Sequence, residues 1–303
     1  MSSEIRNVGS NYKVIRDSLC NYLIEKEFYI IDVGSNGGVN CNPCKTLLSC
    51  NKTRYIYSDP RDSRLDNNNN LEYSYIGKEI TINNAISNSH ELKKLYLTRK
   101  GQVSSLNEPN IDEIAKFDNP HRFEVVEELE VGCTSISKVV KDLAIGIDIL
   151  KIDIQGHEGY VIDSCKNELK EYSPWIIIET NNRDYYKSQY THWELCKLIE
   201  ECGYEVIDIF PKYNYYGSTS SSKSQCRVYT FSDILWRKKL TKNISSERYK
   251  RELAKYTAFG KLFTREGLAL VEAINDRIVN KYVVKLESYY NSGVSAELDQ
   301  YIV

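Results

Sequence analysis

The sequence lacks both a strong net charge and a long apolar run. Its 303 residues carry a formal charge of −2, so no global field attracts the chain to nucleic acid or to an anionic membrane. No segment approaches the run of about 20 apolar residues that crosses a bilayer, and the first residues contain no apolar signal-peptide core. We therefore expect a cytoplasmic protein without a transmembrane segment.

The sequence also lacks an even, regularly spaced set of cysteines. Nine cysteines scattered along a chain without an export signal predict reduced thiols rather than a disulfide framework. Cys41, Cys44 and Cys50 lie close together, but no second Cys-x-x-Cys pair or nearby histidine completes a tetrahedral zinc site. We expect these cysteines to be buried and inert.

Residues 29–38 predict a strand that runs directly into a glycine-rich turn. The strand half has the β-branched and aromatic residues of a buried parallel strand, and Gly34, Gly37 and Gly38 allow the backbone to turn sharply near a ligand. Such turns bind nucleotide-like cofactors at the carboxyl ends of parallel strands. Asp32 would repel a pyrophosphate, and the glycine spacing differs from the dinucleotide and P-loop patterns. S-adenosylmethionine (SAM) carries an ammonium and a sulfonium instead, which suits a carboxylate beside the turn.

Acidic residues recur at the ends of later predicted strands. Asp59 follows the second strand, at the place where a ribose-binding carboxylate is expected, and Asp153 and Glu179 end two further strands. If the sheet is parallel, these acids and Asp32 face one crevice. Lys151 lies on the same side of its strand as Asp153, and buried charges are costly unless paired or used. The alternatives are a loop-capping Asp59 and a purely structural Lys151–Asp153 ion pair.

The whole pattern predicts an α/β fold with additions at both ends of the core. We expect a Rossmann-like, seven-stranded, mostly parallel sheet, with a β-containing insertion after the third strand, residues 80–86. The predicted parts are an N-terminal helix over 1–27 that packs on the core, a core domain over 28–231, and a helical C-terminal extension over 232–303.

The sequence resembles the FkbM-type methyltransferases, a branch of the class I, SAM-dependent methyltransferase fold, over about residues 28–231. The motifs that carry the resemblance are residues 31–38, 84–87, 104–106, 149–158 and 176–179. The most specific is the run Lys-x-Asp-x-x-Gly-x-Glu, which Lys151, Asp153, Gly156 and Glu158 match. The chain departs from the family at Asp59-Pro60, where Glu-Pro is general, and the resemblance does not extend beyond about residue 232.

The resemblance implies SAM-dependent O-methylation of a sugar, a glycan or a similar small polar molecule. A hydroxyl is a weak nucleophile, so its methylation requires a base or a metal. Asp153 is the candidate base, and Lys151, His157 and Glu179 complete the predicted catalytic set, with Lys151 keeping Asp153 ionised. If a divalent cation takes part, Asp153 and Glu179 supply its oxygen ligands, but two acids are too few to establish a metal site.

The predicted binding residues form two groups. Asp32 is expected to anchor the methionine end of SAM, and Asn84 and Ala85 to lie against adenine. The cofactor group is Asp32, Gly34, Ser35, Asn36, Gly37, Gly38, Asp59, Asn84 and Ala85. The acceptor group is Ser105, Glu158, Tyr185, Tyr213, Tyr215 and Tyr216. Flat aromatic faces with a polar tip suit sugar rings, although ordinary loop tyrosines are an equal alternative in a chain with 24 tyrosines.

Three other functions are compatible with parts of this pattern. A nicotinamide-dependent sugar oxidoreductase or epimerase shares the doubly wound fold, but Asp32 and the glycine spacing argue against it, and there is no Tyr-x-x-x-Lys pair. A nucleic-acid base methyltransferase is disfavoured by the near-neutral charge and by the sequence after Asp153. The third is a non-catalytic scaffold that docks through its basic C-terminal helices.

Overall fold

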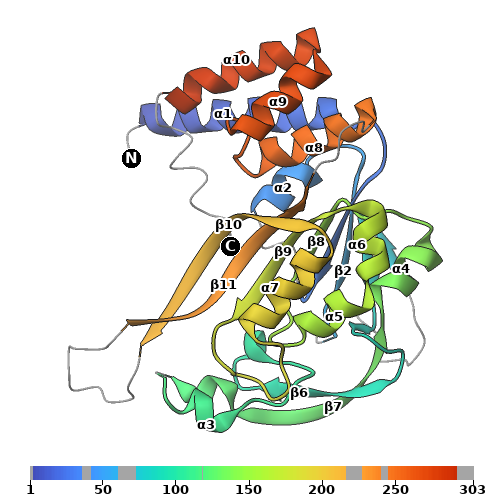
Figure 1. Ribbon diagram of the computed structural model, residues 1–303, viewed down its shortest axis with the longest axis vertical. Helices are drawn as coiled ribbons and strands as arrows, with labels where there is room; N and C mark the ends of the chain where they lie inside the picture. The colour runs from blue at the N-terminus through green and yellow to red at the C-terminus, as the bar shows by residue number, and fades with distance from the viewer. Residues whose placement is uncertain are drawn as a thin grey trace. The chain divides into compact units, whose positions relative to one another are not determined.

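The chain forms two compact units, one dominated by helices and one by β-structure (Figure 1). The computed structural model describes residues 3–35, 42–60, 73–117, 119–215, 227–239 and 245–291. The helical unit draws on residues 1–28, 39–54 and 240–303, and the sheet unit on residues 29–38 and 55–239.

An eight-stranded sheet has the order β10-β11-β9-β8-β1-β2-β4-β3. Its strands are β1 (Phe28–Val33), β2 (Thr53–Ser58), β3 (Tyr73–Ile76), β4 (Glu79–Ile82), β8 (Ile149–Ile152), β9 (Trp175–Asn181), β10 (Tyr204–Tyr215) and β11 (Arg227–Lys238). β8 pairs in parallel with β1 and β9, and β2 with β4, whereas β11 runs antiparallel to β9 and β10. The predicted mostly parallel sheet is confirmed, and β3 adds one antiparallel strand at its edge.

The predicted β-containing insertion forms a separate three-stranded sheet of order β5-β7-β6. Its strands are β5 (Ala85–Ile86), β6 (Leu92–Thr98) and β7 (Val125–Thr134), and it also includes η1 (Gly101–Val103), α3 (Ile111–Ile114) and η2 (Pro120–Phe123). The strand expected over 80–86 is divided, because Asn83 and Asn84 separate β4 from β5. Asparagine is disfavoured in strands, and the chain changes sheet at this pair.

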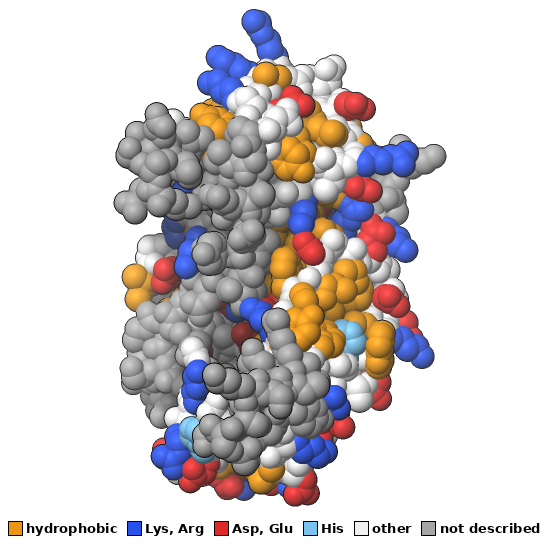
Figure 2. Space-filling model, turned by 90° about the vertical axis from the view of Figure 1, so that its left-hand side faces the viewer, with side chains coloured by type: hydrophobic (Ala, Val, Ile, Leu, Met, Phe, Trp, Pro, Cys, Tyr) orange, Lys and Arg blue, Asp and Glu red, His pale blue; other side chains and the backbone are white. Residues whose placement is uncertain are grey.

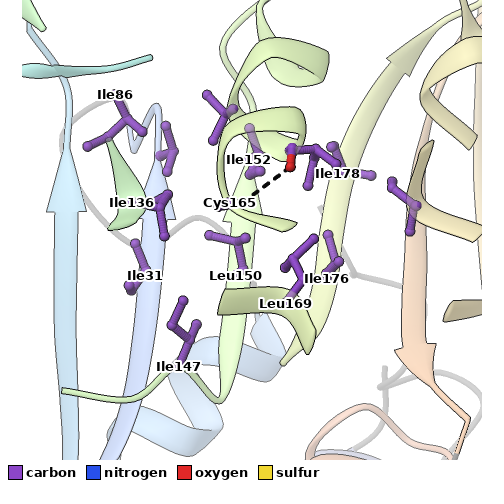
Figure 3. Packing of buried hydrophobic residues seen from close by; sticks show 14 of the residues in the cluster. Ile31, Ile86, Ile136, Ile147, Leu150, Ile152, Cys165, Leu169, Ile176 and Ile178 are labelled. Atoms are coloured by element: carbon purple, nitrogen blue, oxygen red, sulfur yellow. Dashed lines mark hydrogen bonds between the residues drawn. The ribbon is translucent and has the colours of Figure 1, made fainter. Parts of the chain in front are cut away.

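The helices of the sheet unit begin at recognisable caps. They are α4 (Ile136–Leu143), α5 (Glu158–Ser164), α6 (Lys166–Tyr172) and α7 (His192–Glu201). Ser135 accepts a hydrogen bond from the Lys138 amide at the start of α4, and Thr191 and Glu194 form a capping box at α7. Figure 3 shows isoleucine and leucine side chains of β1, β8 and β9 packed against Ile136, Cys165 and Leu169. Each fully buried side chain of this kind contributes about 1.5–3 kcal/mol.

β11 extends to Lys238, so the predicted boundary at residue 232 falls inside a strand. Ile234, Leu235 and Trp236 are buried and pair with β9, which explains why this stretch continues the sheet.

Figure 2 shows Lys and Arg side chains interspersed with Asp and Glu over the face in view, which agrees with the small net charge of the chain.

The helical unit contains α1 (Ser3–Leu23), α2 (Asn42–Leu48), α8 (Ser246–Ala258), α9 (Arg265–Ile274) and α10 (Arg277–Asn291). α1 packs against α8 and α10, so the N-terminal helix shares a unit with the C-terminal extension. Leu19, Leu23 and Leu286 are buried there, and Lys255 donates to Glu252 at 2.8 Å inside the unit. None of the helices in the described ranges is long and apolar enough to cross a membrane.

The seven cysteines among the described residues are in the thiol form, and all are buried except the half-buried Cys196. Cys44 and Cys50 are among the buried ones, as expected for inert thiols. Cys41 lies outside the described residues.

Candidate active site

The candidate site lies at the carboxyl ends of β1, β2, β8 and β9, beside the middle of β11. Register pairs Asp32 with Lys151 across β1 and β8, and Glu179 with Asp233 across β9 and β11. Asp32, Glu179 and Asp233 are buried, whereas Asp153 is only half-buried. Asp153 is therefore the acid of this group that solvent or an acceptor can reach.

Lys151 forms a buried ion pair with Asp32. Its Nζ donates to Asp32 Oδ1 at 3.0 Å, and the Tyr55 hydroxyl donates to Asp32 Oδ2 at 2.7 Å. The sequence suggested a Lys151–Asp153 pair and an Asp32 that faces the cofactor. In the structure Asp32 is 1% exposed, and its charge is compensated inside the sheet by Lys151. An Asp32 contact with the cofactor stays a prediction.

The Gln155 amide links Asp153 to Glu179. Its Nε2 donates to Asp153 Oδ1 at 2.8 Å and to Glu179 Oε1 at 2.8 Å. Its Oε1 lies 3.1 Å from the hydroxyl of buried Tyr186. The two predicted catalytic acids, Asp153 and Glu179, are thus linked by Gln155, which the sequence prediction did not select as a site residue.

Burial and mutual repulsion raise the pKa values of Glu179 and Asp233. Desolvation first, then the charges of Asp153, Asp233 and Glu158, raise the pKa of Glu179 well above its usual value. Desolvation and then Asp153 raise the pKa of Asp233 to about 6, although Lys212, 3.6 Å away, acts in the opposite direction. The protonated form of Glu179 is therefore more favoured than that of an exposed glutamate.

Glu158 shapes the loop that follows β8. Its two carboxylate oxygens accept the backbone N–H groups of Ile154 and Gly156, each at 2.9 Å. It is buried, and desolvation raises its pKa to about 7 despite these bonds. Glu158 was predicted to contact the acceptor, but the structure gives it the task of fixing the backbone beside Asp153.

The insertion clamps this loop from the other side. Ser105 Oγ donates to the Ile154 carbonyl at 3.4 Å, and Asn107 Nδ2 donates to the Gly156 carbonyl at 3.2 Å. Ser105, a predicted acceptor contact, is buried. The residues that hold Asp153 in place therefore come from β8, α5 and the insertion together.

His157 is uncharged and is held beside the same loop by Asn107 and Ser87. Asn107 Oδ1 lies 2.6 Å from His157 Nδ1, and Ser87 Oγ lies 2.9 Å from Nε2. Because Asn107 Nδ2 faces two carbonyl groups, its oxygen faces His157, so Nδ1 carries the hydrogen and Ser87 donates to Nε2. Desolvation, with a smaller effect of Lys93, lowers the pKa of His157 to about 3. The predicted catalytic His157 therefore has both ring nitrogens engaged and stays uncharged near neutral pH.

The ends of β1 and β2 form the predicted cofactor edge. The Gly34 amide donates to the Ser58 carbonyl at 2.8 Å, and the Ser58 hydroxyl donates to the Asn84 carbonyl at 2.5 Å. Ser35, Asp59, Asn84 and Ala85 are buried. Within the described ranges Asn84 Oδ1 has no hydrogen-bond partner. Asn36, Gly37 and Gly38 lie outside the described residues.

Tyr185 packs in an aromatic cluster rather than on a surface. It is 4% exposed, and its ring lies 5.4 Å from Phe117 and stacks on Phe123 at 5.7 Å. Tyr185 therefore has a packing role in this cluster, and its contact with the acceptor stays a prediction. Tyr213 is exposed on β10, and the side chain of Tyr215 and the whole of Tyr216 lie outside the description.

Four site residues had no place in the sequence prediction: Tyr55, Asn107, Gln155 and Asp233. Gln155 stands inside the most specific motif, and Asp233 is a lone acid in an apolar strand, so each had a signal. The partners of Tyr55 and Asn107 are distant in sequence, and only the fold shows them. No three His, Cys, Asp or Glu side chains in the described parts of the chain are grouped as a metal ion would need.

Comparison with known proteins places this site in a family. A search of curated proteins finds no match. Solved structures that the chain matches include methyltransferase FkbM from Methylobacillus flagellatus KT, with 9% identity, a TM-score of 0.31, and coverage of 69% of this chain and 43% of that one. Another is precorrin-6y C5,15-methyltransferase from Geobacter metallireducens GS-15, with 12% identity, a TM-score of 0.30, and coverage of 74% and 88%.

The chain spans less than half the length of the Methylobacillus protein. The sequence model of the methyltransferase FkbM domain matches residues 22–206, which includes the strands that carry Asp32, Asp59, Asp153 and Glu179. The chain therefore belongs to the FkbM methyltransferase family.

Proposed function

We propose that this methyltransferase uses SAM to methylate a hydroxyl of a sugar, a glycan or a similar small polar molecule. The observation that supports it most is the pair of acids at the strand ends. Half-buried Asp153 is joined through Gln155 to the buried Glu179, whose pKa is raised. Asp153 is the accessible acid of the two, and a general base must reach the proton that it accepts.

The residues at the cofactor edge fit SAM. Buried Asp59 at the end of β2 would hold the ribose hydroxyls, and the unpartnered Asn84 Oδ1 would accept the adenine amino group. The methionine end would lie toward Asp32 and the glycine turn. When bound, SAM supplies a methyl carbon on a sulfonium sulfur that leaves as a neutral thioether.

Asp153 then has one task, which is to take the proton of the acceptor hydroxyl as the oxygen bonds to the methyl carbon. Hydrogen bonds from Glu158, Ser105 and Asn107 fix the loop that carries Asp153. The carboxylate therefore keeps its orientation toward the acceptor hydroxyl. The Lys151–Asp32 pair keeps the neighbouring strand ends electrically balanced.

Labelled SAM and a panel of monosaccharides, glycosides and deoxysugars, read by mass shift, tests this proposal. We expect Asp153→Asn to keep SAM binding by calorimetry and to lose transfer by roughly 10²–10⁴-fold, the usual contribution of a general base. The exposed Asp163 gives a matched control, and Asp163→Asn should transfer at the wild-type rate. Transfer by Asp153→Asn at the wild-type rate would remove Asp153 as the base.

Calorimetry also tests the cofactor. Asp59→Ala should weaken SAM binding by about 10–100-fold, the effect of losing a charge-assisted hydrogen bond. Tight binding of NAD without binding of SAM would contradict the proposal and favour an oxidoreductase or epimerase.

A further inference from the structure

The Gln155 side chain occupies the space between the two acids of the site. One amide nitrogen has two hydrogens, and Gln155 Nε2 lies 2.8 Å from an oxygen of Asp153 and 2.8 Å from an oxygen of Glu179. We infer that Gln155 is a positioning residue, which holds the two carboxyl groups at a fixed separation and orients Asp153 toward the acceptor. Its effect on transfer rests on the proposed function, whereas its effect on the acids does not.

Tyr186 lies beside the oxygen end of the Gln155 amide. Its buried hydroxyl lies 3.1 Å from Gln155 Oε1 and 2.9 Å from the Val103 carbonyl, and its single hydrogen is shared between these two acceptors. A hydroxyl hydrogen beside Oε1 favours the amide orientation in which Nε2 faces the carboxylates. Gly156 leaves room for this ring, since a Cβ there would come within 2.8 Å of it.

The strained backbone conformation of Gln155 is a second argument that its side chain is kept for its contacts with the two acids. Its φ is +59°, in the left-handed region that glycine and asparagine adopt more easily than glutamine. A glutamine there is strained, and strain of this kind persists where the surroundings hold the residue. Asparagine would suit the backbone but is one methylene shorter, so its amide would not reach both acids.

The charges around Glu179 explain why neutral donors are required between the acids. Asp153 from the end of β8, Asp233 from β11 and Glu158 from α5 all face Glu179 with negative charge. The cations near this group are Lys212 and Lys151, which act on Asp233. N–H donors favour the ionised form of a carboxyl, so the Gln155 amide acts against this rise in the pKa of Glu179 without adding charge.

Infrared titration of the carboxyl groups, without any ligand, tests the inference. Glu179→Gln identifies the Glu179 band by its loss. We expect the midpoint of that band to rise by roughly one pH unit in Gln155→Gly and Gln155→Asn, because each lost donor had favoured the ionised form. Both variants suit a left-handed backbone, so the fold should be kept. Tyr186→Phe should give a smaller rise, and Tyr204→Phe, which removes another buried hydroxyl from a carbonyl, should give none.

An unchanged Glu179 midpoint in Gln155→Gly would overturn the inference, whatever the enzyme methylates. With the sugar or glycoside that takes up most label from SAM, Gln155→Asn should lower transfer about tenfold and move its pH profile, while SAM affinity stays the same. No transfer by the wild type to any compound would contradict the proposed function, and the infrared result would still decide the role of Gln155.

Discussion

Gly34 and Gly77 both adopt a left-handed backbone, but their surroundings differ. A Cβ at Gly34 would lie 1.9 Å from the Asp153 carbonyl oxygen, whereas a Cβ at Gly77 would meet nothing within 4 Å. We expect Gly77→Ala to cost about 1 kcal/mol of unfolding free energy from backbone strain. Gly34→Ala should cost roughly 3–5 kcal/mol, since β1 and β8 must separate. Urea unfolding measures the loss of unfolding free energy in each variant. Equal losses would show that the backbone can move enough to relieve the contact between Gly34 and the Asp153 carbonyl.

The Lys151–Asp32 pair is a test of a buried charge. Lys151→Met leaves Asp32 in the sheet without its cation, which should cost about 3–5 kcal/mol. Adding Asp32→Asn removes the stranded charge and should restore part of the loss. The exposed helical pair Lys138–Asp142 is the control, and Lys138→Met should cost less than about 0.5 kcal/mol. If Lys151→Met costs no more than Lys138→Met, the ion pair does not stabilise the sheet. Urea unfolding again supplies the free energies.

Three buried acids determine the predicted pH dependence of stability: Glu158 on α5, Glu179 on β9 and Asp233 on β11. The pKa of Glu158 is raised to about 7 and that of Asp233 to about 6, and that of Glu179 is also raised. Such groups bind protons more tightly in the folded state, so their stabilisation is present at low pH and is lost as the pH rises through these pKa values. His157, whose pKa is lowered to about 3, and His192, whose pKa is also lowered by desolvation, act oppositely below the ordinary value of 6.5, but they are two groups against three.

Unfolding free energy should therefore fall between about pH 5 and pH 7.5, by about 1.4 kcal/mol per pH unit for each net proton released. Urea unfolding across this range measures the slope. Asp233→Asn should flatten it between about pH 4 and 6, and Asp163→Asn should leave it unchanged. A slope of the opposite sign would show that these carboxyl groups are ionised in the folded protein.

The strand ends at the candidate site show what the sequence could predict. Asp32, Asp153 and Glu179 follow apolar stretches of strand composition, so their meeting at one edge followed from the parallel sheet. Asp233 was missed because the core domain was expected to end at residue 231. Lys151 was paired with its own neighbour in sequence, since the Asp32 partner depends on the register of β1 with β8. Local pattern thus located the acids, but hydrogen-bond partners distant in sequence required the three-dimensional structure.

At the scale of the whole molecule, the chain passes between the two units four times, at residues 28/29, 38/39, 54/55 and 239/240. Two of these passages fall in β1 and β2, which begin in the helical unit and continue in the sheet unit. If the helical unit unfolded, the first residues of both strands would unfold with it. Covalent continuity therefore predicts that the two units unfold in one transition.

The tryptophans allow this to be measured, because Trp175, Trp193 and Trp236 all belong to the sheet unit. Leu286 on α10 is 1% exposed in the helical unit, and Leu286→Ala should cost about 2–5 kcal/mol. We expect its tryptophan-detected melting temperature to fall by as much as the one detected by far-ultraviolet circular dichroism. Val284, 65% exposed on the same helix, is the control, and Val284→Ala should change neither. A tryptophan transition that stays at the wild-type temperature would show that the sheet unit folds without the helical unit.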